Sequence, residues 1–425
     1  MLLYTTHITS RLQYIATTLL GNHVVIVDNK ENFTHHYGNK INYSAERITA
    51  NELWIKPHGL LSETVVQAQK TDCFEWNGTK AFFATDGDIP FDVFAASFYL
   101  LTRYEEYLPH QLDMYGRYAH ENSLAYKENF LNLPLVNLWV KELGKMMPTH
   151  TLPFSTRNFL PTYDIDIAFC YQHHSLIKNV GGFFRDFLKG NIDKVLERAG
   201  VYSSIKKDPF NIYDWLDALH QHEQLKPIYF FLVAQQRKGY DKNLQPTASS
   251  MQKLMKQHAE KYTVGLHPSW QSGNDEKLLM AEKTIIEKAV GKPINQSRQH
   301  YIKMALPQTY RALLDAGIEH DHSMGYGSIN GFRASYTLPF KWFDLENDQQ
   351  TNLTIHPFCF MDANAYFEQK LSPQQAALEL QQYYNMVKSV NGQLSVVFHN
   401  HFLTEQPEWL PWRTLYEAFL KKNFG

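Results

Sequence analysis

The sequence predicts an α/β fold for the C-terminal part of the chain, built on a parallel sheet that is either open or closed into a barrel. After residue 150, short apolar segments of strand length alternate with segments that have the period of amphipathic helices. Two helices have clear start signals, because Asp208 and Ser372 each directly precede a proline. Strands separated by helices usually lie parallel. The predicted strands are 160–169, 227–233, 263–267, 295–301, 318–322, 353–356 and 394–400.

The region before residue 150 contains both kinds of element. Residues 24–27 are a β-branched run typical of a strand, and residues 91–108 predict a helix with a broad apolar surface. A stretch at 143–158 contains Pro, Thr and Ser, has no sustained period and is typical of a domain edge. We therefore expect a smaller α+β domain at 1–150 and a (β/α) domain at 151–425.

Composition excludes several classes of partner. The chain has 425 residues, a formal net charge of −2 and no basic run, so neither nucleic acid nor an anionic membrane is indicated. No apolar run approaches the roughly 20 residues that span a bilayer, and the N-terminus lacks the pattern of a signal peptide. The widely spaced Cys73, Cys170 and Cys359 argue against a disulfide framework. We expect a cytoplasmic protein, and the sequence leaves its oligomeric state open.

The most informative segment is Thr162-Tyr163-Asp164-Ile165-Asp166, within the first predicted strand. Because side chains alternate along a strand, Asp164 and Asp166 lie on the same face. Carboxylates beside an apolar strand are costly unless they are paired, and a divalent cation is one common partner. A helix cap and an ion pair with arginine would also explain them, and the pair alone favours that simpler interpretation.

Further polar residues end four later strands, and these change the interpretation. The C-terminal ends of parallel strands gather at one edge of a sheet, where active sites of α/β proteins lie. Two carboxylates with several histidines are hard to explain as packing, because buried charge and imidazole need partners. The set fits a metal-dependent hydrolase, with a metal site, a carboxylate base and a histidine acid. The later residues are His267, Arg298, His300, Tyr301, Asp321, His322, His399 and His401.

Four motifs carry a resemblance to a known family. They are Tyr163-Asp164-Ile165-Asp166, Gly265-Leu266-His267-Pro268-Ser269, Arg298-Gln299-His300-Tyr301 and Val396-Val397-Phe398-His399. Together they make residues 158–402 resemble the polysaccharide deacetylases of the NodB homology type, carbohydrate esterase family 4, which hydrolyse N- or O-acetyl groups on sugars. The resemblance implies a distorted (β/α)7 barrel and a carbohydrate substrate. The region before residue 150, with Phe91-Asp92-Val93-Phe94 and Arg103-Tyr104-Glu105-Glu106-Tyr107, looks like the uncharacterised domain that accompanies such deacetylases in Bacteroidetes-type bacteria.

The resemblance also implies a role for each matching residue. A divalent metal is implied, with Zn²⁺ expected and Co²⁺ or Ni²⁺ as alternatives. The implied metal ligands include Asp166 and His267. The implied catalytic residues are the base Asp164, Arg298 that holds it, Tyr301 whose backbone N–H helps to bind the oxyanion, the acid His399, and Asp321 as the candidate that orients and charges His399.

Two positions depart from the family pattern. The family's second metal histidine falls on Gln271, and glutamine is a poor zinc ligand. The proline of the third motif is His300. We hypothesise that His300 supplies the missing imidazole as a metal ligand. The alternative is that His300 only packs or hydrogen-bonds near Arg298, and the sequence leaves both open.

Three functions are consistent with these residues. The first is a metal-dependent hydrolase of C–N bonds other than peptide bonds, which removes acetyl groups, N-acetyl foremost, from a carbohydrate such as an intermediate of envelope or capsular glycan synthesis. The second is an amidohydrolase that acts on a non-sugar amide. The third is a degenerate, metal-free barrel that binds glycan or scaffolds a biosynthetic complex. Gln271 favours the third, whereas the site residues taken together oppose it.

Two segments outside the motifs could contact a substrate. The connection at 171–207 far exceeds the usual βα connection of roughly 2–6 residues. With its aromatic part at 181–188 it could be a lid, or an extra helical pair packed on the rest of the chain. Arg333, after the fifth strand, could meet a substrate carboxylate or phosphate, or pair with an aspartate of the site.

Overall fold

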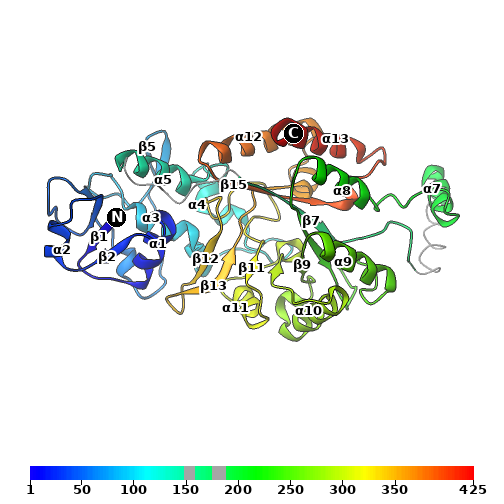
Figure 1. Ribbon diagram of the computed structural model, residues 1–425, viewed down its shortest axis with the longest axis horizontal. Helices are drawn as coiled ribbons and strands as arrows, with labels where there is room; N and C mark the ends of the chain where they lie inside the picture. Colours follow the sequence, from blue (N-terminus) through cyan, green and yellow to red (C-terminus); the bar gives the residue numbers. More distant parts are fainter. Residues whose placement is uncertain (148–157, 175–187) are drawn as a thin grey trace.

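Two main sheets organise the chain, a small one near the N-terminus and a large one in the rest of the molecule (Figure 1). The computed structural model describes residues 1–147, 158–174 and 188–425. Most of the expected domain edge at 143–158 and of the aromatic segment at 181–188 lies outside the described residues. Within the described ranges, no helix is long and apolar enough to cross a bilayer.

The small sheet is parallel throughout, in the order β2-β1-β3-β4. Helix α1 (Ser10–Leu20) connects β1 to β2, and Thr9 caps it by accepting the Leu12 N–H. Parallel strands joined by a helix are typical of α/β proteins, so the α+β class expected for this region was wrong in that respect. The strands are β1 (Leu2–Thr5), β2 (Val25–Val27), β3 (Lys40–Tyr43) and β4 (Leu53–Trp54).

Helix α3 (Val93–Leu101) is buried on every side, as the broad apolar surface predicts. The Asp92 side chain caps it by accepting the Ala95 N–H at 3.0 Å. The helix ends earlier than expected, and Arg103 beyond it has a left-handed conformation with φ 55°. The other described elements here are α2 (Lys30–Thr34), η1 (Leu60–Ser62), β5 (Phe74–Trp76), β6 (Thr79–Ala81), η2 (Tyr104–Tyr107), η3 (His120–Asn122), α4 (Leu124–Lys127) and α5 (Leu135–Met146).

The large sheet has the order β12-β13-β11-β10-β9-β8-β7-β15-β14. Each of the seven predicted strands has a counterpart in it, and β9 has the predicted bounds. All pairings are parallel except β12 with β13. The strands are β7 (Asn158–Ile165), β8 (Ile228–Leu232), β9 (Thr263–His267), β10 (Gln296–Ser297), β11 (His320–Asp321), β12 (Phe340–Asp344), β13 (Gln349–Ile355), β14 (Phe360–Met361) and β15 (Gln393–His399).

The described pairings leave this sheet open, so the distorted (β/α)7 barrel that the resemblance implies is not closed by strand pairing among the described residues. The edge strands are β12 and β14, neither of which the sequence predicted. At the β12 edge, side chains of α1 from the N-terminal region pack against the large sheet. Tyr14 donates a hydrogen bond to the Lys341 carbonyl at 2.8 Å, and its ring lies 5.0 Å from that of Phe343. Arg11 pairs with Asp348 at 2.8 Å in the following hairpin.

Helices lie on both sides of the large sheet in Figure 1, with α8, α12 and α13 on one side and α9, α10 and α11 on the other. Ser372 begins α12 with a capping box, as predicted. Asp208 does not cap α8; it accepts the backbone N–H groups of Cys170, Tyr171 and Gln172 instead. The helices are α7 (Ile192–Tyr202), α8 (Tyr213–His222), α9 (Ser249–Lys261), α10 (Glu276–Val290), α11 (Gln308–Asp315), α12 (Pro373–Ser389) and α13 (Leu410–Phe424).

A buried ion network joins the two parts of the chain. Glu106 lies between Arg103, at 2.7 Å, and Arg333, at 2.5 Å, and all three side chains are at most 2% exposed. Burial alone would raise the pKa of Glu106, but the Arg333 and Arg103 guanidinium groups outweigh it and lower this pKa to about 2. Arg333 therefore pairs with neither a substrate nor a site aspartate. Its partner is a carboxylate from the N-terminal region.

Replacing Glu106 with Gln should destabilise the folded protein by about 3–5 kcal/mol, because two buried guanidinium groups lose their counter-charge. The measurement is the free energy of unfolding in urea. Glu142→Gln is the matched control, since its partner Lys145 is 63% exposed, and its cost should stay within about 1 kcal/mol. Equal losses in the two variants would contradict a stabilising role for the network.

Candidate active site

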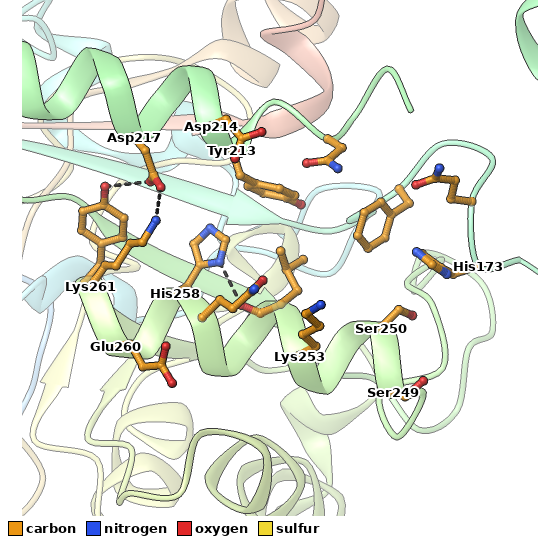
Figure 2. A pocket seen from close by; sticks show the side chains of 16 residues that line it. His173, Tyr213, Asp214, Asp217, Ser249, Ser250, Lys253, His258, Glu260 and Lys261 are labelled. Carbon is orange, nitrogen blue, oxygen red and sulfur yellow. Dashed lines mark hydrogen bonds and ion pairs between the residues drawn. The ribbon is translucent and has the colours of Figure 1, made fainter. Parts of the chain in front are cut away.

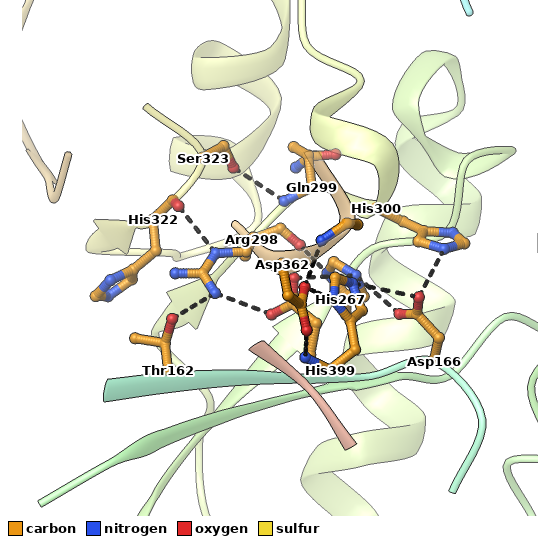
Figure 3. Close-up of polar contacts among 12 residues, drawn as sticks. Thr162, Asp166, His267, Arg298, Gln299, His300, His322, Ser323, Asp362 and His399 are labelled. Carbon is orange, nitrogen blue, oxygen red and sulfur yellow. Dashed lines mark hydrogen bonds and ion pairs between the residues drawn. The ribbon is translucent and has the colours of Figure 1, made fainter. Parts of the chain in front are cut away.

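Several of the polar residues predicted from the sequence lie close together at the C-terminal ends of the parallel strands, among them Asp166, His267 and His399 (Figure 3). Asp164 on β7 lies directly opposite His399 on β15 in the strand register. His267 ends β9, and Arg298 follows β10. A cavity of about 580 Å³ opens at this edge, and its wall includes Asp164, Asp166 and the candidate histidines His267, His300, His399 and His401.

Asp166, His267 and His300 bring three potential ligand atoms within 4.8 Å of one another. His267 Nε2 lies 3.3 Å from Asp166 Oδ1, and His300 Nε2 lies 3.5 Å from Asp166 Oδ2. Asp166 Oδ1 is a buried atom with no hydrogen-bond partner in the described part of the chain. A buried carboxylate oxygen of this kind is costly unless a cation meets it.

The outer nitrogen of each imidazole is held by a separate acceptor. His267 Nδ1 contacts the Arg298 carbonyl, and His300 Nδ1 lies 2.8 Å from Asp241 Oδ1. A proton on Nδ1 leaves Nε2 as a lone pair that faces Asp166, the tautomer a metal ligand requires. The residues present therefore fit a divalent cation such as Zn²⁺, for which one carboxylate and two imidazoles are an ordinary set of protein ligands.

The pKa values of His300 and Asp166 also indicate that this cluster stabilises positive charge. Burial would lower the pKa of His300, but the carboxylates of Asp166 and Asp241 outweigh it and raise the pKa to about 9. Burial would raise the pKa of Asp166, but the neighbouring imidazoles hold it well below its usual range. The cluster therefore stabilises positive charge, and a metal ion would replace the proton on His300.

Gln271 does not belong to this cluster. Its side chain is not part of the cavity wall, and its backbone N–H donates to Asp241 Oδ2 at 3.4 Å. His300 lies at the cavity instead, and the idea that it replaces the missing ligand stays a hypothesis. Sequence analysis missed Asp241, which has no motif around it and comes from the connection after β8.

Arg298 fixes one oxygen of Asp164. Its Nη1 donates to Asp164 Oδ1 at 2.9 Å and to Thr162 Oγ1 at 2.7 Å, while Nε donates to the His322 carbonyl at 3.0 Å. The guanidinium is fully buried and stacks over the Phe230 ring at 4.5 Å. Asp164 Oδ2 stays on the cavity side, 3.8 Å from His267 Nε2. One oxygen is therefore anchored and the other can act on a proton.

Asp362, not Asp321, orients His399. Asp362 Oδ1 lies 2.6 Å from His399 Nδ1, and Oδ2 accepts the His399 backbone N–H at 2.7 Å. Asp321 accepts hydrogen bonds from Ser297 and Ser323 instead. The reason is strand order, because Asp362 directly follows β14, the neighbour of β15, whereas β11 is several strands away. The role expected for Asp321 was therefore wrong.

His399 has the charge state of an acid. Burial would lower its pKa, but Asp362 outweighs burial and raises the pKa to about 10. Its Nε2 lies 3.7 Å from Asp166 Oδ2, on the cavity side. Burial lowers the pKa of His401 to about 3, so this second histidine is neutral beside it.

The cavity wall also holds aromatic residues. Tyr301 is followed directly by Ile302, and both have left-handed backbones, with φ 59° and 54°. The Tyr301 ring lies 4.8 Å from that of Tyr240 and 5.3 Å from that of Tyr115. Tyr115 and Arg117 belong to the N-terminal region and still line this cavity. Sequence analysis missed them, because residues so far from the motifs give no signal of their position.

A second hollow, of about 670 Å³, lies between α8 and α9 (Figure 2). Among its charged groups, Lys261 and Asp217 pair at 2.5 Å, and the Tyr262 hydroxyl donates to Asp217 at 2.7 Å. Burial lowers the pKa of His258 on its wall, so that imidazole is held neutral. The charges of Lys261 and Asp217 therefore neutralise each other on the wall of this hollow.

A family model and several solved structures are similar to parts of this chain. Residues 1–152 match a family of unknown function, DUF7033. No curated protein matches the sequence. Similar solved structures include a protein assigned as a polysaccharide deacetylase from Mycobacterium smegmatis, with a TM-score of 0.40 and 13% identity over 64% of this chain and 87% of that one. A polysaccharide deacetylase from Bacillus cereus has a TM-score of 0.31 and 10% identity over 63% of this chain and 88% of that one. The allantoinase PuuE has a TM-score of 0.39 and 9% identity over 63% of this chain and 85% of that one.

Replacing Asp241 with Asn should weaken zinc binding by about 10–100-fold, because Asp241 orients the His300 ligand without touching the metal position. His300→Ala should weaken it further. Competition against a chromophoric chelator measures both. Gln271→Ala is the matched control and should bind zinc as wild type does. If His300→Ala binds zinc as tightly as wild type, His300 is not a ligand.

Proposed function

We propose that this protein is a metal-dependent hydrolase that removes acetyl groups, N-acetyl foremost, from a carbohydrate. The observation that carries the proposal is the convergence of Asp166, His267 and His300, which place one potential ligand atom each within 4.8 Å of one another. A divalent cation bound there would supply Lewis acidity, polarising a water molecule and the acetyl carbonyl. These three residues would hold it, with Asp241 and the Arg298 carbonyl orienting the imidazoles.

Asp164 is the proposed general base. Arg298 holds one of its oxygens, so the other oxygen faces the cavity in a fixed direction and takes a proton from the attacking water. Nη1 of Arg298 also donates to Thr162 Oγ1, which helps to hold the guanidinium against Asp164.

His399 is the proposed general acid. Asp362 holds it protonated and turns Nε2 toward the cavity, where it gives a proton to the departing amine nitrogen or sugar oxygen. His399 is therefore the proposed proton donor and Asp164 the proposed proton acceptor, and each is oriented by a buried partner. The Tyr301 backbone N–H is the proposed donor to the developing oxyanion.

The wall of the cavity supports a sugar as substrate. Tyr115, Tyr240 and Tyr301 place rings on one side of it, and aromatic faces suit the C–H faces of a pyranose.

Two other functions would use the same residues in a different way. A non-sugar amide would need the same water activation and leaving-group acid, and a metal-free glycan-binding protein would need neither.

A screen for released acid over N-acetyl sugars, nucleotide sugars and non-sugar amides, with zinc-loaded protein, tests the proposal. Asp164→Asn should lower kcat for a substrate found there by about 10²–10⁴-fold, because the base is lost, while zinc still binds. Asp217→Asn, which removes a carboxylate outside the cavity, is the control and should keep wild-type turnover.

Each alternative has its own outcome in that screen. Release of acid from non-sugar amides alone indicates the amidohydrolase. Failure of the wild-type protein to bind zinc, with no turnover of any compound, indicates the metal-free binding protein. Wild-type turnover by Asp164→Asn would show that Asp164 is not the base.

A further inference from the structure

One turn of the N-terminal region reaches the candidate active site. Residues 111–119, here called the Arg117 turn, are closed by a bridge between Leu112 and Tyr118. Asp113 holds it from within, since its Oδ1 accepts the backbone N–H groups of Tyr115 at 2.9 Å and of Arg117 at 3.0 Å. The turn therefore presents Tyr115 and Arg117 in a fixed arrangement, and both line the cavity.

Arg117 connects this turn to the catalytic side of the molecule. Its Nε donates to Asp113 Oδ2 at 2.6 Å, and its Nη1 donates to the Tyr301 carbonyl at 2.9 Å. The Arg117 side chain is 6% exposed, so both bonds are largely shielded from water. The guanidinium occupies space that Gly327 leaves free, because a Cβ there would collide with Nη1 and lie 2.8 Å from the Tyr301 carbonyl oxygen. Three segments far apart in the sequence thus meet around one guanidinium.

The hydrogen bond from Arg117 to the Tyr301 carbonyl holds a backbone segment of unusual conformation. Tyr301 and Ile302 are consecutive left-handed residues without being glycine, and each costs roughly 1–2 kcal/mol relative to an ordinary backbone. Strained conformations of this kind persist only where neighbouring groups hold them. The Arg117 bond supplies one such group, and the Tyr115 ring, 5.3 Å from that of Tyr301, supplies another.

The strained turn lies at the centre of the site. It begins directly after His300, whose imidazole is a candidate metal ligand, and its Tyr301 N–H is the proposed oxyanion donor. A shift of this backbone would move both groups, and displacements of about 1 Å in an active site can cost about 10²-fold in rate. The backbone conformation at residues 299–303 is therefore a requirement of the chemistry.

We infer that the N-terminal region completes the active site, with Arg117 as a positioning residue that holds the Tyr301 backbone in its working conformation. Arg117 acts through Tyr301 and does not touch the reacting atoms. The effect on rate rests on the proposed function, whereas the effect on the backbone does not. The region that matches a family of unknown function thus has a defined task in this chain.

Hydrogen exchange of the amides in residues 299–303, measured by mass spectrometry on the full-length protein, tests the inference directly. Arg117→Ala should speed exchange there, because the strained turn loses the donor to its carbonyl. The matched control is Asp348→Ala, which breaks the ion pair with Arg11 elsewhere on the boundary between the two parts of the chain. The control should leave exchange at 299–303 unchanged.

Turnover adds a readout that a merely structural role would not change. Arg117→Ala should lower kcat by up to about 10²-fold with KM unchanged, since the oxyanion contact is made only in the transition state. Added guanidinium ion should restore part of the rate by occupying the space of the lost side chain, and it should not help Asp164→Asn.

The outcomes separate the inference from the proposed function. Wild-type exchange at 299–303 in Arg117→Ala overturns the inference, as does equal acceleration in Asp348→Ala. Faster exchange in Arg117→Ala alone supports it, even if the wild-type protein releases no acetate, a result that would overturn the proposed function only. If Arg117→Ala does not fold, Arg117→Lys replaces it, because the lysine keeps the charge next to Asp113 but loses the two-armed fork.

Discussion

The carboxylate of Asp166 sets the constraint on which the rest of the site depends. It faces the imidazoles of His267, His300 and His399 at 3.3–3.7 Å, and one of its oxygens has no hydrogen-bond partner among the described residues. The Asp166 side chain is only 18% exposed, and negative charge at such a site is stabilised where positive charge offsets it. The imidazoles that can supply this positive charge come from different strands and loops. Asp166, His267 and His300 could also hold a metal ion.

Each functional side chain is held by a second buried group from a different strand or loop. Arg298 anchors Asp164, Asp362 anchors His399, and Asp241 anchors His300. The second group fixes the orientation of each working side chain. For His399 and His300 the anchoring carboxylate also raises the pKa of the imidazole. In each pair the anchoring group donates or accepts through a short contact, and the working atom stays free to face the cavity.

The N-terminal region is structurally continuous with this machinery. Glu106 pairs with Arg333 across the boundary, Tyr14 and Arg11 cover the β12–β13 edge, and Arg117 meets the Tyr301 turn. At the open β12 edge of the large sheet, the N-terminal region is attached through side chains of α1.

The sequence by itself determined the features that local periodicity controls. The alternation of a strand put Asp164 and Asp166 on one face, and the C-terminal ends of parallel strands collected His267, Arg298 and His399 at one edge. Only the tertiary structure decided that Asp362 replaces Asp321, that Asp241 stands behind His300, and that Arg117 reaches the site. Those contacts depend on strand order and the docking of distant segments. These contacts produce no periodic pattern or fixed spacing in the sequence, because each one joins residues that only folding brings together.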